Sequence, residues 1–113
     1  MKSMEEMIQA AQQAAETIQK QMGETQEKLD SIEVEGISGG GLVKVRCSAK
    51  GRVVGVGIDD SLMVPSEKPI LEDLVAAAYN DARAKADEVA GEEMAKMQQG
   101  MGLPPGFKLP GMG

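Results

Sequence analysis

The chain has 113 residues, the size of a single domain, and its 12 basic and 18 acidic side chains give a formal net charge of −6. It lacks histidine, the commonest general base and neutral metal ligand, and its one cysteine excludes an internal disulfide. We therefore expect no enzyme, no cofactor, no metal site and no small-molecule substrate. Net negative charge also disfavours nucleic-acid binding unless a local basic patch exists.

The first thirty residues carry charges throughout, and no apolar run approaches the roughly 18 to 20 residues that span a bilayer. These features predict a soluble, cytoplasmic protein without a signal peptide or a membrane partner. Aromatic side chains are limited to Tyr79 and Phe107, so smaller aliphatic residues and nine methionines must form the core. A core this lean favours oligomerisation.

A heptad pattern predicts one long helix over residues 3–30, with apolar or small residues at alternating steps of four and three. The seam consists of Met4, Ile8, Ala11, Ala15, Ile18, Met22, Thr25 and Leu29. Such a helix is about 42 Å long, whereas a compact chain of this size is roughly 34 Å across. The stripe therefore needs a partner, which is the second helix of the chain or a second copy. The alternative is a surface helix on its own domain.

A period of two replaces the heptad after residue 31 and predicts strands over residues 32–38, 42–50 and 52–59. The glycines at 39–41 form a hairpin turn rather than a phosphate loop, because a strand and not a helix follows them. In the second strand the alternation places Cys47 on the apolar face, as a core residue rather than a nucleophile. In the third strand it places Val54, Val56 and Ile58 inward. The strands then form an antiparallel meander with one face covered by helices.

Pro69 suits the first turn of a second long helix, predicted over residues 69–99. Its apolar stripe includes Leu71 and Val75. We expect these two and five residues of the first helix to form the dimer or helix seam: Met4, Ile8, Ile18, Met22 and Leu29. Residues 100–113, rich in glycine and proline, form a tail that cannot continue the helix. The predicted fold is α+β, with one α-β-β-β-α domain over residues 1–99 and a dimer with projecting helical arms.

Charge is unevenly distributed, and only residues 31–58 are basic, with four cations against two carboxylates. Strand parity places Lys44, Arg46 and Lys50 on one face. They are, together with Arg52, the first candidates for phosphate contacts, and the candidates on the helices are Lys20, Lys28, Arg83 and Lys85. The alternative is a solvated face whose charges serve solubility. The consecutive pairs Asp59–Asp60 and Glu92–Glu93 are interpreted as solvated charges, because neighbouring side chains diverge.

Four segments of the sequence resemble the YbaB/EbfC family in order along nearly the whole chain. They are residues 36–45 (GISGGGLVKV), 58–62 (IDDSL), 71–82 (LEDLVAAAYNDA) and 102–108 (GLPPGFK). The resemblance implies a bacterial, nucleoid-associated DNA-binding protein, a dimer whose sheets join at the centre and whose long helices project like tweezers. It supplies no DNA-contact motif that can be matched to residues here.

The leading hypothesis is a homodimeric, nucleoid-associated DNA-binding protein of low sequence specificity that influences nucleoid organisation or gene expression. The resemblance favours it. The alternative is an acidic helical protein–protein adaptor without direct DNA binding, which the net charge of −6 favours.

Overall fold

The computed structural model describes residues 3–100, and it confirms the predicted fold class. Short 3-10 turns, which the sequence did not predict, follow the first strand (η1, Gly39–Gly41) and precede the last helix (η2, Asp60–Leu62; η3, Pro65–Glu67). The main elements are α1 (Met4–Ser31), β1 (Glu33–Ser38), β2 (Val43–Ser48), β3 (Val53–Ile58) and α2 (Lys68–Gly100). The predicted tail lies outside the described residues apart from Gly100, which ends α2.

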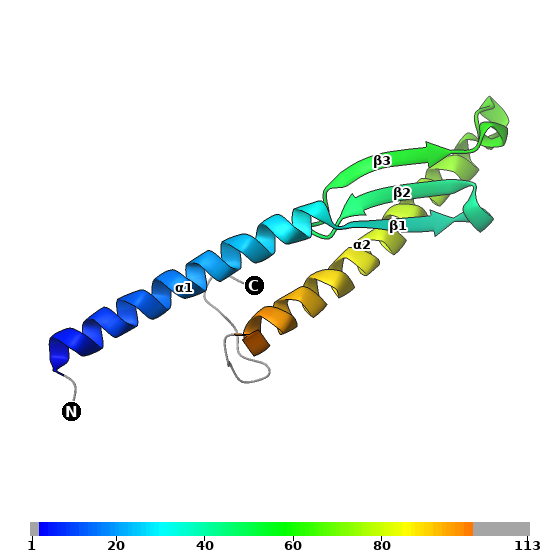
Figure 1. The fold of residues 1–113 in the computed structure, drawn as a ribbon. Coiled ribbons are helices and arrows are strands. Elements are labelled where there is room, and N and C mark those ends of the chain that lie inside the picture. The colour runs from blue at the N-terminus through cyan, green and yellow to red at the C-terminus, as the bar shows by residue number, and fades with distance from the viewer. Residues whose placement is uncertain (1–2, 101–113) are drawn as a thin grey trace.

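The molecule is a rod of 76 × 21 × 18 Å with a radius of gyration of 20.7 Å. A compact chain of this length would have a radius of gyration of about 13 Å. Figure 1 shows the reason: α1 leaves the sheet at one end and extends well past the end of α2. The overhang predicted from helix length is therefore confirmed.

Helix α1 begins and ends at local signals in the sequence. The Ser3 hydroxyl accepts a hydrogen bond from the Glu6 N–H at 3.2 Å, and Glu5 and Glu6 occupy the first turn, where the helix dipole favours negative charge. At the other end the Leu29 carbonyl accepts from Ala49 N–H at 3.1 Å, just after β2. This contact fixes the direction in which α1 leaves the sheet.

The sheet is an antiparallel meander in the order β1-β2-β3, as predicted. The turn between β1 and β2 depends on Gly39, Gly40 and Gly41, whose φ angles of 59°, 67° and 104° lie in the region that favours glycine. The hairpin interpretation of this segment is confirmed.

Helix α2 covers β1 and β2 at very short range (Figure 1). A Cβ atom at Gly36 would overlap the Ala78 carbonyl oxygen and the Ala82 nitrogen, so the helix backbone lies directly on the strand. Ala78, Ala82 and Ala86 are completely buried along this line. The core combines these small residues with Val43, Val45, Cys47 and Leu62. Cys47 is 0 % exposed, as its predicted core position requires.

The prediction for β3 was wrong in part. Val54 and Val56, expected to face inward, are 40 % and 51 % exposed. Two causes combine: α2 covers β1 and β2 but extends little over β3, and a register shift beside Arg46 and Cys47 sets Val53 opposite Cys47. A bulge of this kind changes which residue of a strand faces the core.

The predicted second strand was too long at its C-terminal end. β2 ends at Ser48, whose N–H donates to the Arg52 carbonyl at 2.8 Å and whose carbonyl accepts from Gly51 N–H at 2.8 Å. The sequence placed Lys50 on the strand face with Lys44 and Arg46. That prediction was wrong, because Lys50 lies in the turn that follows β2. Ser48 is fully buried although it shares the strand parity of Lys44 and Arg46, and its hydroxyl accepts a hydrogen bond from the Arg52 N–H at 3.3 Å.

Candidate nucleic-acid interface

The sheet face opposite α2 carries the two basic residues of β2, Lys44 and Arg46, both exposed. Their neighbours on β3 are Gly57 and Gly55, so β3 adds no side chain to this face. A Cβ at Gly55 would overlap the guanidinium of Arg46, which therefore lies flat across the glycine. The glycines thus leave both cations open to a large polyanion.

The same face is electrically balanced by β1, which lies on the other side of β2. Glu35 pairs with Arg46 in the register of the strands, and Glu33 approaches Arg46 with Nη1 and Oε2 3.8 Å apart. Both partners of this ion pair are about half exposed, and such pairs are worth roughly 0–1 kcal/mol. A phosphate can replace the carboxylate, but the open face on its own is not a strong positive patch.

A second group of cations surrounds the turn between β2 and β3. We call Lys50, Arg52 and Arg83 the turn cluster. Gly51, with φ 93°, forms the turn, and a Cβ on it would overlap the guanidinium of Arg83 from α2. The sequence placed Arg83 on a separate helical arm, and the packing of α2 on the sheet brings it to the turn.

Each arginine of the turn cluster is restrained by one surface carboxylate. Arg52 Nη2 lies 3.4 Å from Asp30 Oδ1, and Arg83 Nε lies 3.2 Å from Asp87 Oδ1. Lys50 takes part in no ion pair within residues 3–100. All four paired side chains are between 47 % and 64 % exposed, so the guanidinium groups remain available to phosphate oxygens.

The remaining cationic candidates are scattered. Lys85 lies over β1. Its Nζ is 3.0 Å from Asp81 Oδ2 and donates a hydrogen bond to the Glu35 carbonyl at 2.8 Å. Asp81 also accepts from Ile37 N–H at 2.9 Å, which with Lys85 lowers the pKa of the Asp81 carboxyl. Lys20 lies alone on the projecting part of α1, without an ion pair among the described residues. The structure does not bring these lysines to the turn cluster.

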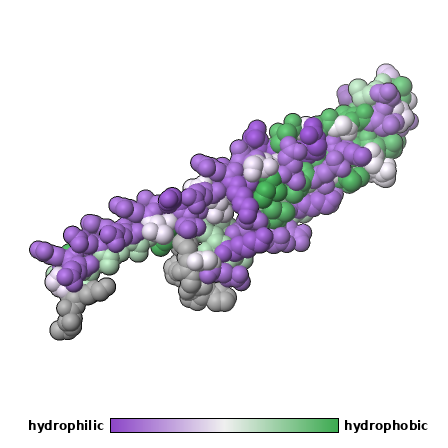
Figure 2. Space-filling view, viewed as in Figure 1, coloured by the Kyte–Doolittle hydropathy of each residue, from purple (hydrophilic) through white to green (hydrophobic). Residues whose placement is uncertain are grey.

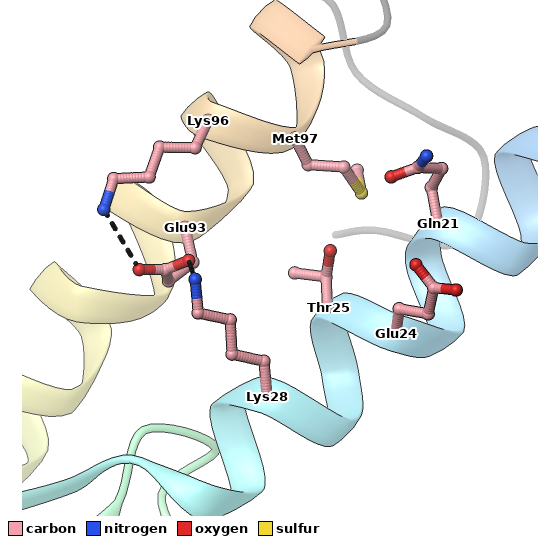
Figure 3. Close-up of a pocket in the computed structure, with 7 residues that line it drawn as sticks. All are labelled: Gln21, Glu24, Thr25, Lys28, Glu93, Lys96 and Met97. Atoms are coloured by element: carbon pink, nitrogen blue, oxygen red, sulfur yellow. Dashed lines mark hydrogen bonds and ion pairs between the residues drawn. The ribbon is translucent and has the colours of Figure 1, made fainter.

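Lys28 belongs to the junction of α1 and α2, shown in Figure 3. Its Nζ lies 2.8 Å from Glu93 Oε2, and Lys96 Nζ lies 3.3 Å from the other oxygen of the same carboxylate. Glu93 is only 12 % exposed, and the hydrogen bond from Lys28, followed by that from Lys96, lowers its pKa. The interpretation of Glu93 as a solvated charge was therefore wrong.

The junction also contains an open pocket of about 250 Å³. Met97, which is 7 % exposed, points across it toward Thr25 (Figure 3). The pocket is lined by Gln21, Glu24, Thr25, Lys28, Glu93, Lys96 and Met97. Its open, mixed polar lining is typical of the gap between two diverging helices, and we assign it no ligand.

Asp59 caps a turn rather than standing free in solvent. Its carboxylate accepts from the N–H of Ser61 at 3.0 Å and from the Ser61 hydroxyl at 2.5 Å, and both bonds lower its pKa. In the part of the chain that the structure describes, acidic and cysteine side chains form no group of three or more that could hold a metal ion. No helix in that part is long and apolar enough to cross a membrane.

The predicted seam residues divide into two groups. Leu29 is 3 % exposed, and Leu71 and Val75 pack against the core of their own chain. Met4 and Ile8, by contrast, are 78 % and 51 % exposed, and the positions between them and Leu29 change gradually toward burial. The seam is thus satisfied within one chain only near the sheet.

Comparison with known proteins agrees with this architecture. The family model of the YbaB/EbfC DNA-binding family matches residues 1–101. The chain belongs to this family. The resemblance read from the sequence is thereby confirmed.

The relatives of this YbaB/EbfC chain are similar over almost their whole length. A nucleoid-associated protein of Rhodopseudomonas palustris is 52 % identical over 103 residues, which covers 91 % of this chain and 92 % of the relative. One from Rickettsia felis is 46 % identical over 96 residues, covering 85 % and 90 %. A crystal structure of an uncharacterized protein from Helicobacter pylori superposes with a TM-score of 0.61 at 26 % identity, covering 74 % of this chain and 96 % of the other.

Proposed function

We propose that this protein is a nucleoid-associated homodimer that binds duplex DNA through phosphate contacts with low sequence specificity, and thereby influences nucleoid organisation or gene expression. The observation that carries the proposal is the turn cluster: Lys50, Arg52 and Arg83, from a turn and a helix far apart in sequence, lie around the turn at Gly51. Membership of the YbaB/EbfC DNA-binding family supports it. The names of the nucleoid-associated relatives support a location at the nucleoid.

Low specificity follows from which elements carry the cations. The turn cluster and the pair Lys44 and Arg46 lie on a turn, a flat sheet face and the side of a helix packed on that sheet. Side chains in these positions reach phosphate oxygens, which position a protein on DNA but carry no sequence information.

The homodimer is proposed from the uncovered side of β3. Val53, Val54 and Val56 are 45 %, 40 % and 51 % exposed, and β3 is an edge strand whose outer hydrogen-bonding groups face away from β2. An apolar edge strand exposed in this way invites pairing with another chain. A second copy placed against β3 would bury these valines and bring two turn clusters into one particle, which doubles the number of phosphate contacts.

The dimer is tested by sedimentation of wild type and of Val56→Lys. The substitution puts a charge into the proposed interface and should reduce the mass to that of one chain. Circular dichroism of the variant controls for folding. A folded Val56→Lys variant that keeps the wild-type mass would contradict an interface at β3.

DNA binding is tested by titrating duplex DNA at several salt concentrations. If about six phosphates are neutralised, the logarithm of the binding constant should fall against the logarithm of salt with a slope near −5. The double variant Lys44→Glu/Arg46→Glu should bind more weakly. Lys68→Glu, at the start of α2, in neither basic group and outside any described ion pair, is the control.

A protein–protein adaptor remains the second candidate because most of the candidate cations already have carboxylate partners. Among the eight, Lys28, Arg46, Arg52, Arg83 and Lys85 form ion pairs. Absence of DNA binding by the wild type at low salt would favour the adaptor. A salt slope near zero would contradict binding through phosphate contacts.

A further inference from the structure

The apolar seam of α1 has two parts with different surroundings. From Thr25 to Leu29 it packs against the body of its own chain, and Met97 near the end of α2 reaches α1 at Thr25. Toward its N-terminus α1 extends beyond the end of α2, as Figure 1 shows, and Gln21 is the first residue of α1 that still lines the pocket beside Met97. We call residues 4–22 the arm. Its seam shows no large buried residue within the described chain, and Met4 is 78 % exposed.

The seam of the arm has a symmetry that a helix packed on its own domain does not require. It reads the same from either end, as Met4, Ile8, Ala11, Ala15, Ile18 and Met22. An antiparallel copy therefore places methionine opposite methionine, isoleucine opposite isoleucine and alanine opposite alanine. In heptad terms, Ile8, Ala15 and Met22 are a positions and the others are d positions. Antiparallel helices pair a with d, as this seam does.

The residues that flank the seam permit two acidic chains to meet. They are Met7, Ala14 and Gln21 on one side and Glu5, Gln12 and Gln19 on the other. In the antiparallel arrangement the single charge, Glu5, comes opposite Gln19 of the second copy, so no like charges face each other. The remaining carboxylates of the arm, Glu6 and Glu16, lie outside the flanking positions. Antiparallel packing also opposes the two helix dipoles.

We propose that the arm is a self-association surface, on which the arm of a second copy docks antiparallel with its two-fold axis beside Gln13. The small residues Ala11 and Ala15 at the centre allow close approach, and the larger residues at both ends bury the exposed apolar surface. The occupant is a second copy rather than another protein, because the seam complements itself in both size and charge.

The arm contact and the contact at β3 are different interfaces. The axis of the arm contact crosses α1 at right angles, whereas β3 lies beyond the far end of α1, along the length of a rod 76 Å long. One two-fold axis cannot serve both. Two distinct self-complementary contacts join dimers into a larger assembly. This linking of dimers rests on the proposed homodimer, while the arm contact itself does not.

The arm contact is short, about 27 Å at 1.5 Å per residue. Helical pairs of this length with alanine at their centre are marginal in water. Dimers bound near each other on DNA would meet at a high effective concentration, which strengthens a weak contact without any new interaction. The arms would thus link neighbouring dimers on DNA and separate when the DNA is removed.

Cysteine cross-linking tests the orientation. Ala14 lies beside the proposed axis, so Ala14→Cys should form a disulfide between two copies on mild oxidation. Ile8→Cys should not, since antiparallel packing puts the two Ile8 positions far apart. Wild type is the control because its Cys47 is buried. Failure of Ala14→Cys to cross-link, or cross-linking by Ile8→Cys, would overturn the proposal.

Sedimentation at high protein concentration without DNA tests the assembly. Wild type should exceed the dimer mass, and Ile8→Glu should return to it, while Gln9→Glu, with the same added charge on the outer side of the helix, should behave as wild type. A wild-type mass that never exceeds the dimer would overturn the linking of dimers. Because DNA is absent, a failure of DNA binding would leave both results intact.

Discussion

The two ends of the rod differ in how their apolar residues are packed. At the sheet, glycine and alanine bring α2 so close to β1 that a Cβ at Gly36 would overlap the helix backbone. In the arm, by contrast, the large apolar side chains of Met4 and Ile8 are 78 % and 51 % exposed. Figure 2 shows the contrast, with hydrophobic residues gathered over the sheet end and mostly hydrophilic residues on the visible face of α1. The buried small residues mark a contact completed within the chain, whereas the large exposed residues of the arm are available for the proposed contact with a second copy.

The largest expected effect lies at the sheet end. Gly36→Val would force the side chain into the Ala78 carbonyl and the Ala82 nitrogen, and should lower the free energy of unfolding by about 3 kcal/mol or more. Thermal or denaturant unfolding measures it. Gly57→Ala is the matched control, because a Cβ there meets nothing within 4 Å, and it should change stability by less than about 0.5 kcal/mol. If Gly36→Val left the free energy of unfolding unchanged, α2 would have to be able to move away from β1.

The packed and the free part of α1 can be compared directly, because Leu29 and Ile8 occupy the same heptad position three heptads apart. Leu29→Ala should cost about 2–4 kcal/mol, because Leu29 is 3 % exposed. Ile8→Ala should cost less than about 0.5 kcal/mol in dilute protein, because Ile8 is 51 % exposed. Unfolding in denaturant gives both values. Equal losses would mean that the arm has a partner already at low concentration.

The turn cluster is expected to affect DNA binding and not stability. Arg52→Gln/Arg83→Gln removes two phosphate contacts, so the salt slope should become less negative by about 2 and affinity should fall about tenfold at moderate salt. Since both arginines form exposed ion pairs, the free energy of unfolding should change by less than about 1 kcal/mol. Lys68→Gln is the control for charge. An unchanged salt slope would indicate that Lys44 and Arg46, or the arm, make the phosphate contacts instead.

The sequence predicted what depends on local pattern. The heptad steps of α1, the three glycines of the first hairpin and the parity that buries Cys47 were all confirmed. The bulge beside Val53 was not predictable, because nothing in the local alternation shows where a strand gains a residue. The uncovered side of β3 depends on the position of α2 across the sheet, which strand periodicity does not contain.

The candidate site could be predicted only in part for the same reason. Lys50 and Arg52 were identified, but Arg83 was assigned to a helical arm, since its contact with Gly51 joins residues distant in sequence. Glu93 was interpreted as solvated because the side chains of two consecutive carboxylates diverge. Either residue of such a pair can face a neighbouring helix, and only the crossing of α1 and α2 decides that Glu93 does so.

The smallest effect concerns this crossing and is visible in its pH dependence. The hydrogen bond from Lys28 lowers the pKa of Glu93 below the ordinary value of 4.5, so the folded state binds the proton less tightly than the unfolded chain does. The stabilisation is therefore fully present above pH 4.5 and is lost as the pH falls through the lowered pKa. Glu93→Gln should be slightly less stable than wild type at neutral pH and equal to it in acid, as unfolding in urea at several pH values would show. Glu92→Gln, on the exposed side of the same turn, is the control. If the two variants have the same pH dependence, Glu93 does not join the arm-bearing helix to α2, and the division of α1 into a packed and a free part rests on Leu29 and Met97 alone.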